Sequence, residues 1–224
     1  MSIVMTFRIA LKALNRNKMR TMLTMLGMII GVAAVITMVA LGNGASQSIE
    51  QQIASAGTNV IMVNAGNFTS GGVRMGAGAS NTLMPEDAEA IRTQVPGVQY
   101  VAAGVDQGAQ VVAGNQNWFS RVQGTDVELP MIRAWATESG AFFTPSDVSS
   151  AAKVCVIGTT VRDMLFPDGS DPVGQMIRIR NQPFKIVGVM ASRGQSAMGQ
   201  DQDDVIFAPY TTIQKKFRGI TYIQ

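Results

Sequence analysis

The feature that most constrains this chain is an uncharged run at residues 21–41, which contains only Met, Leu, Ile, Val, Ala, Gly and Thr. At about 1.5 Å of rise per residue, a helix of this length covers roughly the 30 Å of a bilayer's hydrocarbon core. A cleaved signal peptide has a shorter apolar core of about 7–15 residues, and a buried helix of a soluble protein usually keeps a polar stripe. The run therefore predicts one retained transmembrane helix over residues 19–42.

Positive charge is concentrated before this run. Residues 1–20 carry five cations and no acid, whereas residues 50–224 carry 13 Lys/Arg against 15 Asp/Glu. Because cytoplasmic flanks of membrane spans are enriched in Lys and Arg, we expect the amino terminus in the cytoplasm and the main domain outside. A basic tip beside an apolar run favours membrane lipid over nucleic acid as a partner. The cations are Arg8, Lys12, Arg16, Lys18 and Arg20.

Residues 1–18 are predicted to form a cytoplasmic amphipathic segment. Arg8, Lys12 and Arg16 are four residues apart and share one face of a helix, with Phe7 and Leu11 among the apolar residues opposite. Such a helix can lie along the inner leaflet with its cations among the headgroups. Anchoring explains the pattern as well as a second interpretation, in which the cations receive force from a cytoplasmic partner.

Beyond the predicted span, residues 43–57 are polar and rich in Gln and Ser, which predicts that the helix continues into water as a stalk. Residues 58–66 form a β-branched run of strand type, and the glycine-rich stretch 69–80 is expected to be a poorly ordered loop. Residues 85–94 are predicted to be a helix, because a proline and acids occupy its first turn and Pro-Gly follows it.

Short strand patterns fill the rest of the chain and predict an α+β domain. In one of them, Ile177 and Ile179 alternate with Arg178 and Arg180 ahead of a second apolar run, which predicts a hairpin with one buried face. A short helix is expected at 160–167. The predicted strands cover residues 98–105, 109–114, 118–124, 153–158, 175–180, 183–191 and 203–209.

Catalytic chemistry is largely excluded by composition. The chain has no histidine, which removes His-dependent triads, imidazole zinc sites and most proton shuttles. The single cysteine, Cys155, lies in an apolar strand pattern and is interpreted as a core thiol. The glycine-rich stretch lacks the lysine of a phosphate-binding P-loop. We therefore predict no catalytic residue and no bound cofactor.

An unusual polar stretch, GQSAMGQDQDDV, occupies residues 194–205. Its aspartates could bind a hard cation, but the spacing, central glycine and terminal glutamate of an EF-hand are absent. A solvated loop or a subunit contact is the favoured interpretation, with no metal site predicted. The partner-interface candidates are Gln195, Asp201, Asp203 and Asp204.

Nine blocks in one order along the whole chain resemble the permease of MacB-type ABC transporters. They are RTMLTMLGMIIGVAAVI, LGNGASQSI, GTNVIMV, PEDAEAI with PGV, VQGTD, KVCVIGTTVRDMLFP, DPVGQMIRI, PFKIVGVM and GQSAMGQDQDDVIFAPYTT. The resemblance implies a porter-like α+β subdomain at 58–128 that continues at 213–224, and an inserted β-rich, sabre-like subdomain at 129–212. It also implies a homodimer in the bacterial inner membrane, whose periplasmic domains are moved by ATP hydrolysis in a partner ATPase that uses ATP and Mg²⁺. Some members add a periplasmic adaptor and an outer-membrane channel.

Three departures from that family pattern stand out. The sequence stops at TYIQ without a second apolar span, so a fragment or truncated product is expected. No ATPase domain precedes the span, which resembles members whose ATPase is a separate subunit. Met84 precedes the helix at 85–94, where relatives commonly place a capping Thr; its loss is expected to weaken the helix start by about 1 kcal/mol.

Three hypotheses of different class follow. The leading one is a permease subunit that couples cytoplasmic ATP hydrolysis to movement of its outer domain for export, with Arg8, Lys12 and Arg16 near the coupling surface. The alternative is a membrane-anchored interaction domain that regulates an envelope partner such as a cell-wall hydrolase. An anchored enzyme is disfavoured because histidines and a paired-carboxylate motif are absent.

Overall fold

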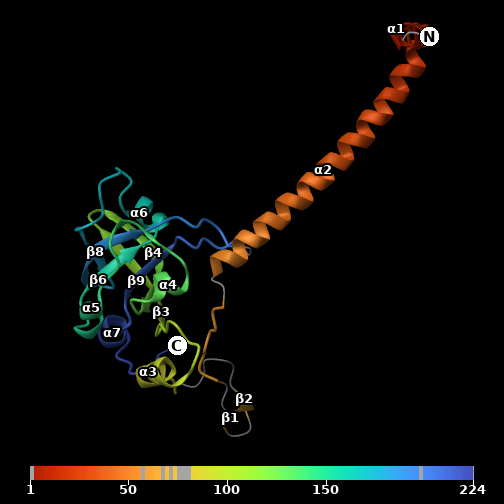
Figure 1. Ribbon diagram of the computed structural model, residues 1–224. Helices are drawn as coiled ribbons and strands as arrows, with labels where there is room; N and C mark the ends of the chain where they lie inside the picture. Colours follow the sequence, from red (N-terminus) through yellow and green to blue (C-terminus); the bar gives the residue numbers. More distant parts are fainter. Residues whose placement is uncertain are drawn as a thin grey trace. The chain divides into compact units, whose positions relative to one another are not determined.

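The computed structural model describes residues 3–56, 59–66, 69–70, 73–74, 82–196 and 199–223. Contacts within the chain divide it into two compact units, Met1–Gln51 and Gln52–Gln224. Figure 1 traces the elements of both, with long helices in the first unit and mainly strands in the second.

The first unit consists of helix α1 (Ile3–Arg16) and most of helix α2 (Lys18–Ala56), separated by Asn17. Within α2, Lys18–Gln47 is long and apolar enough to cross a membrane, and none of its most apolar window is buried. The helix predicted over 19–42 continues without interruption to Ala56, as the stalk prediction requires. Gly57, where the stalk was predicted to end, lies outside the described residues.

Threonines inside the apolar run use the helix itself as their hydrogen-bond partner. Thr24 Oγ1 donates to the carbonyl of Arg20 at 3.0 Å, and Thr37 Oγ1 donates to the carbonyl of Ala33 at 2.8 Å. In hydrocarbon an unpaired hydroxyl is costly, so this internal pairing makes both threonines compatible with a membrane position.

The predicted strand at 58–66 is wrong for the residues that the structure describes. Residues 59–66 carry no strand, and Ile61, Met62 and Val63 are exposed. A β-branched run becomes a strand only where another segment supplies the hydrogen-bond ladder, and none of the described segments does so here. Most of the stretch 69–80 lies outside the described residues; its described pairs, β1 (Thr69–Ser70) and β2 (Val73–Arg74), form a short antiparallel ladder.

From residue 82 onward, the described part of the second unit combines short helices with a seven-stranded mixed sheet. Its helices are α3 (Pro85–Gln94), α4 (Leu129–Ile132), α5 (Pro145–Ser149), α6 (Thr159–Leu165), α7 (Tyr210–Ile213) and a π-helical turn, η1 (Gln214–Arg218). Its strands are β3 (Val105–Ala113), β4 (Gln116–Thr125), β5 (Thr137–Gly140), β6 (Val154–Ile157), β7 (Met176–Ile179), β8 (Gln182–Met190) and β9 (Val205–Pro209).

The strands close on themselves. Their order is β5-β8-β6-β9-β4-β3-β7, and β7 also pairs with β8, so β8, β6, β9, β4, β3 and β7 form a hydrogen-bonded ring. The β4–β9 and β6–β8 pairs are parallel and the other pairs antiparallel. Closure pairs the strand edges that an open sheet would leave unsatisfied.

Two apolar clusters lie on opposite faces of strands β6 and β9. Cys155, Ile157, Ile206 and Ala208 belong to the larger cluster, which also contains inward residues of β3, β7 and β8. Val156, Val205 and Phe207 belong to the second, where the Trp135 and Phe207 rings meet edge to face at 5.5 Å. Because β6 and β9 are covered on both faces, their sequences are continuously apolar rather than alternating.

The hairpin predicted from alternating Ile and Arg is confirmed. Ile177 and Ile179 are fully buried and Arg178 is exposed, and β7 pairs antiparallel with β8. Arg180 is not on the strand face as predicted. Arg180 and Asn181 form the two-residue turn with φ of 45° and 66°, the left-handed pair that matches the twist of a tight hairpin.

Strands on both sides of the subdomain boundary predicted between 128 and 129 pair in one sheet. Strands β3 and β4 lie before this boundary, yet β4 pairs with β9 and β3 with β7. The strand predicted at 98–105 is present only from Val105 onward. The division into porter-like and sabre-like subdomains itself stays a prediction.

Candidate functional site

The five cations predicted to set topology or coupling lie on the first unit and are exposed. Arg8, Lys12 and Arg16 follow one another at four-residue spacing in α1, and Lys18 and Arg20 occupy the first turn of α2. Met5, Phe7 and Ile9 of α1 are exposed as well. This arrangement suits a helix that meets both charged and apolar surroundings, and the role of these cations in coupling stays a prediction.

The polar loop after β8 is organised by one buried carboxylate, that of Asp203. It accepts hydrogen bonds from Ser192 Oγ at 2.6 Å, from the Arg193 amide at 2.8 Å and from the Gly194 amide at 2.9 Å. The residue is only 3% exposed. Asp203 was a partner-interface candidate, but a side chain this buried is better explained as a structural carboxylate that folds the loop.

Two opposing effects act on the Asp203 carboxyl. Burial raises its pKa, while the hydrogen bonds from Ser192, Arg193, Gly194 and Thr159 lower it. The hydrogen bonds prevail and the pKa of Asp203 lies below its usual value. The carboxylate is therefore charged at neutral pH although it is buried.

The other loop candidates are less buried than Asp203, with Asp204 half-buried. Gln195 and Asp201 are exposed and face each other in an isolated antiparallel bridge. Asp201 Oδ2 accepts from Thr160 Oγ1 at 2.6 Å, and Asp204 Oδ1 accepts from Trp118 Nε1 at 3.0 Å. These contacts tie the loop to α6 and β4. Within the part of the chain that the structure describes, no group of three or more potential metal ligands lies close enough to hold an ion.

An arginine also fixes the base of this loop. The Arg193 guanidinium lies 4.5 Å from the centre of the Trp135 ring and donates to the carbonyl of Arg133. Trp135 Nε1 donates to the carbonyl of Ala191 at 2.6 Å. Both contacts come from the segment between α4 and β5. The loop is therefore held by this segment as well as by α6 and β4.

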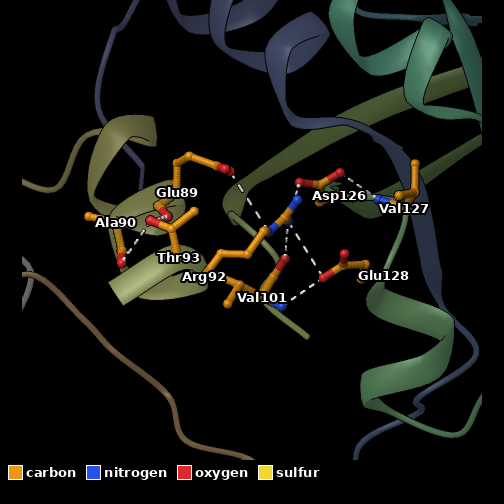
Figure 2. Close-up of polar contacts among 8 residues, drawn as sticks. All are labelled: Glu89, Ala90, Arg92, Thr93, Val101, Asp126, Val127 and Glu128. Carbon is orange, nitrogen blue, oxygen red and sulfur yellow. Dashed lines mark hydrogen bonds and ion pairs between the residues drawn. The ribbon is translucent and has the colours of Figure 1, made fainter. Parts of the chain in front are cut away.

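A polar cluster that sequence reasoning missed surrounds Arg92, in the last turn of α3 (Figure 2). Its Nη2 atom donates to the carbonyl of Val101 at 2.9 Å and lies 3.5 Å from both Asp126 Oδ2 and Glu128 Oε2. Its Nε atom lies 3.8 Å from Glu89 Oε2. We refer to Arg92, Glu89, Val101, Asp126 and Glu128 as the Arg92 cluster.

The acids of the Arg92 cluster also hold the backbone. Glu128 Oε2 accepts from the amide of Val101 at 2.7 Å, and Asp126 Oδ1 accepts from the amide of Val127 at 2.8 Å (Figure 2). The cluster thus joins α3, the segment before β3 and the corner after β4. Arg92 and Glu128 are separated by more than 30 residues in the sequence, and a single sequence contains no signal that pairs them.

Cys155 is a core thiol, as predicted. It is fully buried and belongs to the larger apolar cluster. Burial raises the pKa of its thiol well above its usual value, so the thiolate required of a nucleophile does not form at physiological pH.

Comparison with known proteins gives consistent matches. A family profile described as the MacB-like periplasmic core domain matches residues 21–224. The chain is 43% identical over 211 residues to the macrolide export ATP-binding/permease protein MacB of Syntrophobacter fumaroxidans, covering 94% of this chain and 29% of that protein. With the protein of the same name from Marinobacter nauticus, identity is 37% over 215 residues, covering 96% and 33%. The chain thus spans about a third of the length of these relatives.

Solved structures show the same fold. The periplasmic region of MacB from Actinobacillus actinomycetemcomitans matches with a TM-score of 0.55 and 22% identity, over 63% of this chain and 61% of that one. The extracellular domain of the noncanonic ABC-type transporter YknZ from Gram-positive bacteria matches with a TM-score of 0.54 and 17% identity, over 64% and 70%.

Proposed function

The chain belongs to the MacB-like periplasmic core domain family, and from this premise we propose that it is the part of an ABC transporter permease that carries ATP-driven motion across the membrane to an outer domain. Movement of this domain then drives export of a substrate that is bound outside the cytoplasmic membrane. In this mechanism the 224 residues act as a mechanical element, with no reaction of their own.

The observation that supports this most directly is the continuity of α2. One helix of 39 residues, Lys18–Ala56, contains the apolar run and reaches the start of the second unit. At about 1.5 Å per residue it is roughly 58 Å long, about twice the thickness of the hydrocarbon core. A helix that leaves the membrane without a break passes displacement and rotation along its axis, whereas a flexible linker absorbs them.

The proposed location is the bacterial inner membrane, with the amino terminus in the cytoplasm and the second unit in the periplasm or outside the cell. The cations Arg8, Lys12, Arg16, Lys18 and Arg20 support this orientation through the positive-inside rule. We further propose that these cations form a basic surface at which a cytoplasmic ATPase docks.

The proposed partners follow from the family. ATP hydrolysis with Mg²⁺ belongs to a nucleotide-binding subunit outside these residues, since the chain has no P-loop lysine. Pairing of two copies, a periplasmic adaptor and an outer-membrane channel are further proposals. The exposed Gln195 and Asp201 and the half-buried Asp204 are candidates for a contact outside the membrane.

Export is favoured over regulation of a cell-wall hydrolase because both relatives described above are named macrolide exporters. An envelope partner that is a hydrolase, with no nucleotide-driven export, would reverse the preference.

The decisive experiment alters the stiffness of α2 outside the apolar run. In one variant of the whole transporter, assembled with its ATPase in nanodiscs, about seven Gly/Ser residues follow Ser46; in the matched control, about seven Ala-rich helical residues follow it, close to two turns. Hydrogen exchange of residues 82–209 is compared between the nucleotide-free and the ATP-trapped states.

The expected result is a nucleotide-dependent change in exchange that the helical insertion preserves and the flexible insertion removes. Both variants should insert in the membrane equally, because the apolar run is unchanged. Persistence of the full nucleotide response in the flexible variant would contradict transmission through α2.

A further inference from the structure

We propose that the Arg92 cluster is a releasable latch between α3 and the strand ring, which decides whether the two move as one body. The idea rests on the proposed function for its purpose, but its geometry stands independently. It concerns only contacts within the second unit.

Helix α3 is held to the domain by little apolar contact. None of its residues is buried, and only Leu83 and Ala88 of this region pack as partly buried neighbours against the larger apolar cluster. One further backbone hydrogen bond, from the Ile223 amide to the Leu83 carbonyl at 2.9 Å, lies before the helix. Movement of α3 therefore exposes little apolar surface and meets little hydrophobic resistance.

Polar contacts at the other end of α3 supply the attachment instead. Arg92 reaches two acids and one carbonyl of other segments, Asp126, Glu128 and Val101 (Figure 2). The side chains are partly exposed, at 39% for Arg92, 20% for Asp126 and 21% for Glu128. Ion pairs that solvent reaches contribute little individually and are screened by salt, so the latch can open without disrupting a core.

The carboxylates around Arg92 favour the open state once its guanidinium no longer lies between them. Three carboxylates, those of Glu89, Asp126 and Glu128, surround one guanidinium. Glu89 belongs to α3, whereas the other two belong to the corner after β4. Without Arg92 between them, like charges repel across this junction, so the arrangement has a closed state and a repelled one.

The chain next to the latch allows such movement. Val95 ends α3, and Gly97 follows with φ of +87°, a conformation that other residues rarely adopt. Residues 98–104 form no helix or strand before β3 begins at Val105. A glycine between a helix and an irregular segment is a suitable pivot.

The test measures the position of α3 relative to the ring, without nucleotide. Spin labels are placed at Gln94→Cys in α3 and Asn117→Cys in β4, both exposed positions, in the full chain in nanodiscs; Cys155 is buried and stays unlabelled. Distributions of the distance between the two spin labels, measured by pulsed electron paramagnetic resonance, are compared for wild type, Arg92→Gln and the double variant Asp126→Asn/Glu128→Gln. Arg162→Gln is the matched control, since Arg162 pairs with Glu138 and Asp163, neither of which belongs to the Arg92 cluster or to α3.

At low salt we expect wild type to show one narrow distance with at most a small second population. In Arg92→Gln and in the double variant, this second population should be roughly fivefold larger than in wild type, or more. About 1 M salt should produce the same population in wild type, because it shortens the screening length to about 3 Å. Arg162→Gln should stay narrow. A single unchanged distance in both cluster variants and in high salt would overturn the latch.

This outcome is separable from that of the proposed function. The distance experiment uses no nucleotide, so it can succeed even if α2 transmits no motion. Conversely, α2 can transmit motion while the cluster stays rigid. Circular dichroism of each variant confirms that the domain is folded, and the double variant, which keeps Arg92, opens the latch from the acidic side.

Discussion

The backbone of Asp203 lies against Gly158 so closely that a Cβ on Gly158 would be 2.0 Å from the Asp203 carbonyl oxygen. Gly158 is the amino-terminal cap residue of α6, and its amide donates to the carbonyl of Val205 at 2.9 Å. The end of β6 and the loop before β9 are thus joined where only glycine fits.

Gly158→Ala should consequently destabilise the domain by about 2–3 kcal/mol, because backbone must move to admit a methyl group. Thermal unfolding of the full chain in nanodiscs measures the effect. Gly66→Ala is the control, since within the described residues a Cβ there meets no atom within 4 Å beyond its own chain neighbours, and its φ lies outside the left-handed region. Equal unfolding temperatures for the two variants would show that the contact is not limiting.

Asp203 predicts a pH dependence of stability. Its folded pKa is below its usual value, because hydrogen bonds outweigh burial, whereas the unfolded value is about 3.9. The stabilisation is therefore fully present above about pH 4 and is lost as the pH falls through the lower folded pKa. Asp203→Asn should be less stable than wild type at pH 7, and the difference should shrink in acid. Asp168→Asn, at an exposed loop position, should show a smaller difference at every pH.

Ser120 is buried at 1% exposure in β4, and within the described residues its Oγ has no hydrogen-bond partner. Removing an unsatisfied buried hydroxyl avoids its desolvation cost, so Ser120→Ala should raise stability by about 1 kcal/mol. Thr212 provides the opposite case, because its buried Oγ1 donates to the Ala152 carbonyl at 2.8 Å. Thr212→Val should lower stability by about 1–2 kcal/mol. Denaturant titration compares them, and a loss in both variants would mean that Ser120 has an essential partner.

Local patterns in the sequence predicted the elements whose cause is local. The uncharged run, the proline and acids of α3, and the alternation of Ile177 and Ile179 each depend on neighbouring residues. The corresponding helices and the β7–β8 hairpin are present. The strand predicted at 58–66 is absent from the described residues 59–66, because strand formation depends on a distant partner that residue propensity does not specify.

Features that depend on residues far apart in the chain could not be predicted from the sequence. Closure of the ring requires β3 to meet β7, and β7 to meet β8. The Arg92 cluster likewise needs two segments brought together by the fold. In the loop, the acidic pattern identified Asp203 as a candidate, but its burial shows that it holds backbone amides inside the domain. The sequence alone does not distinguish such a carboxylate from one that faces a partner.

Met84 stands at the amino-terminal cap of α3 without a side-chain hydrogen bond to the helix. Half of a capping box is already present, because Asp87 Oδ2 accepts from the Met84 amide at 2.8 Å. Met84→Thr should complete it and stabilise the helix start by about 1 kcal/mol. The chain's own complete box, Thr144 with Asp147 at α5, is the reference, and Thr144→Met should cost a similar amount. Hydrogen exchange of the first turn of each helix reports both changes; unchanged exchange in α3 would show that its cap does not limit opening.

The five amino-terminal cations predict the orientation of the chain in the membrane. In intact spheroplasts, an added protease should digest the second unit of the wild-type protein and leave the amino terminus protected. Replacing Arg8, Lys12, Arg16, Lys18 and Arg20 by Gln removes the charge bias that retains this end in the cytoplasm, so a fraction of molecules should become protected in spheroplasts and digestible in inverted vesicles. Lys215→Gln/Lys216→Gln, which removes two exposed cations of η1, is the control and should keep the wild-type pattern. Protection of the wild-type second unit in spheroplasts would reverse the assigned orientation, and with it the direction in which α2 is proposed to carry motion.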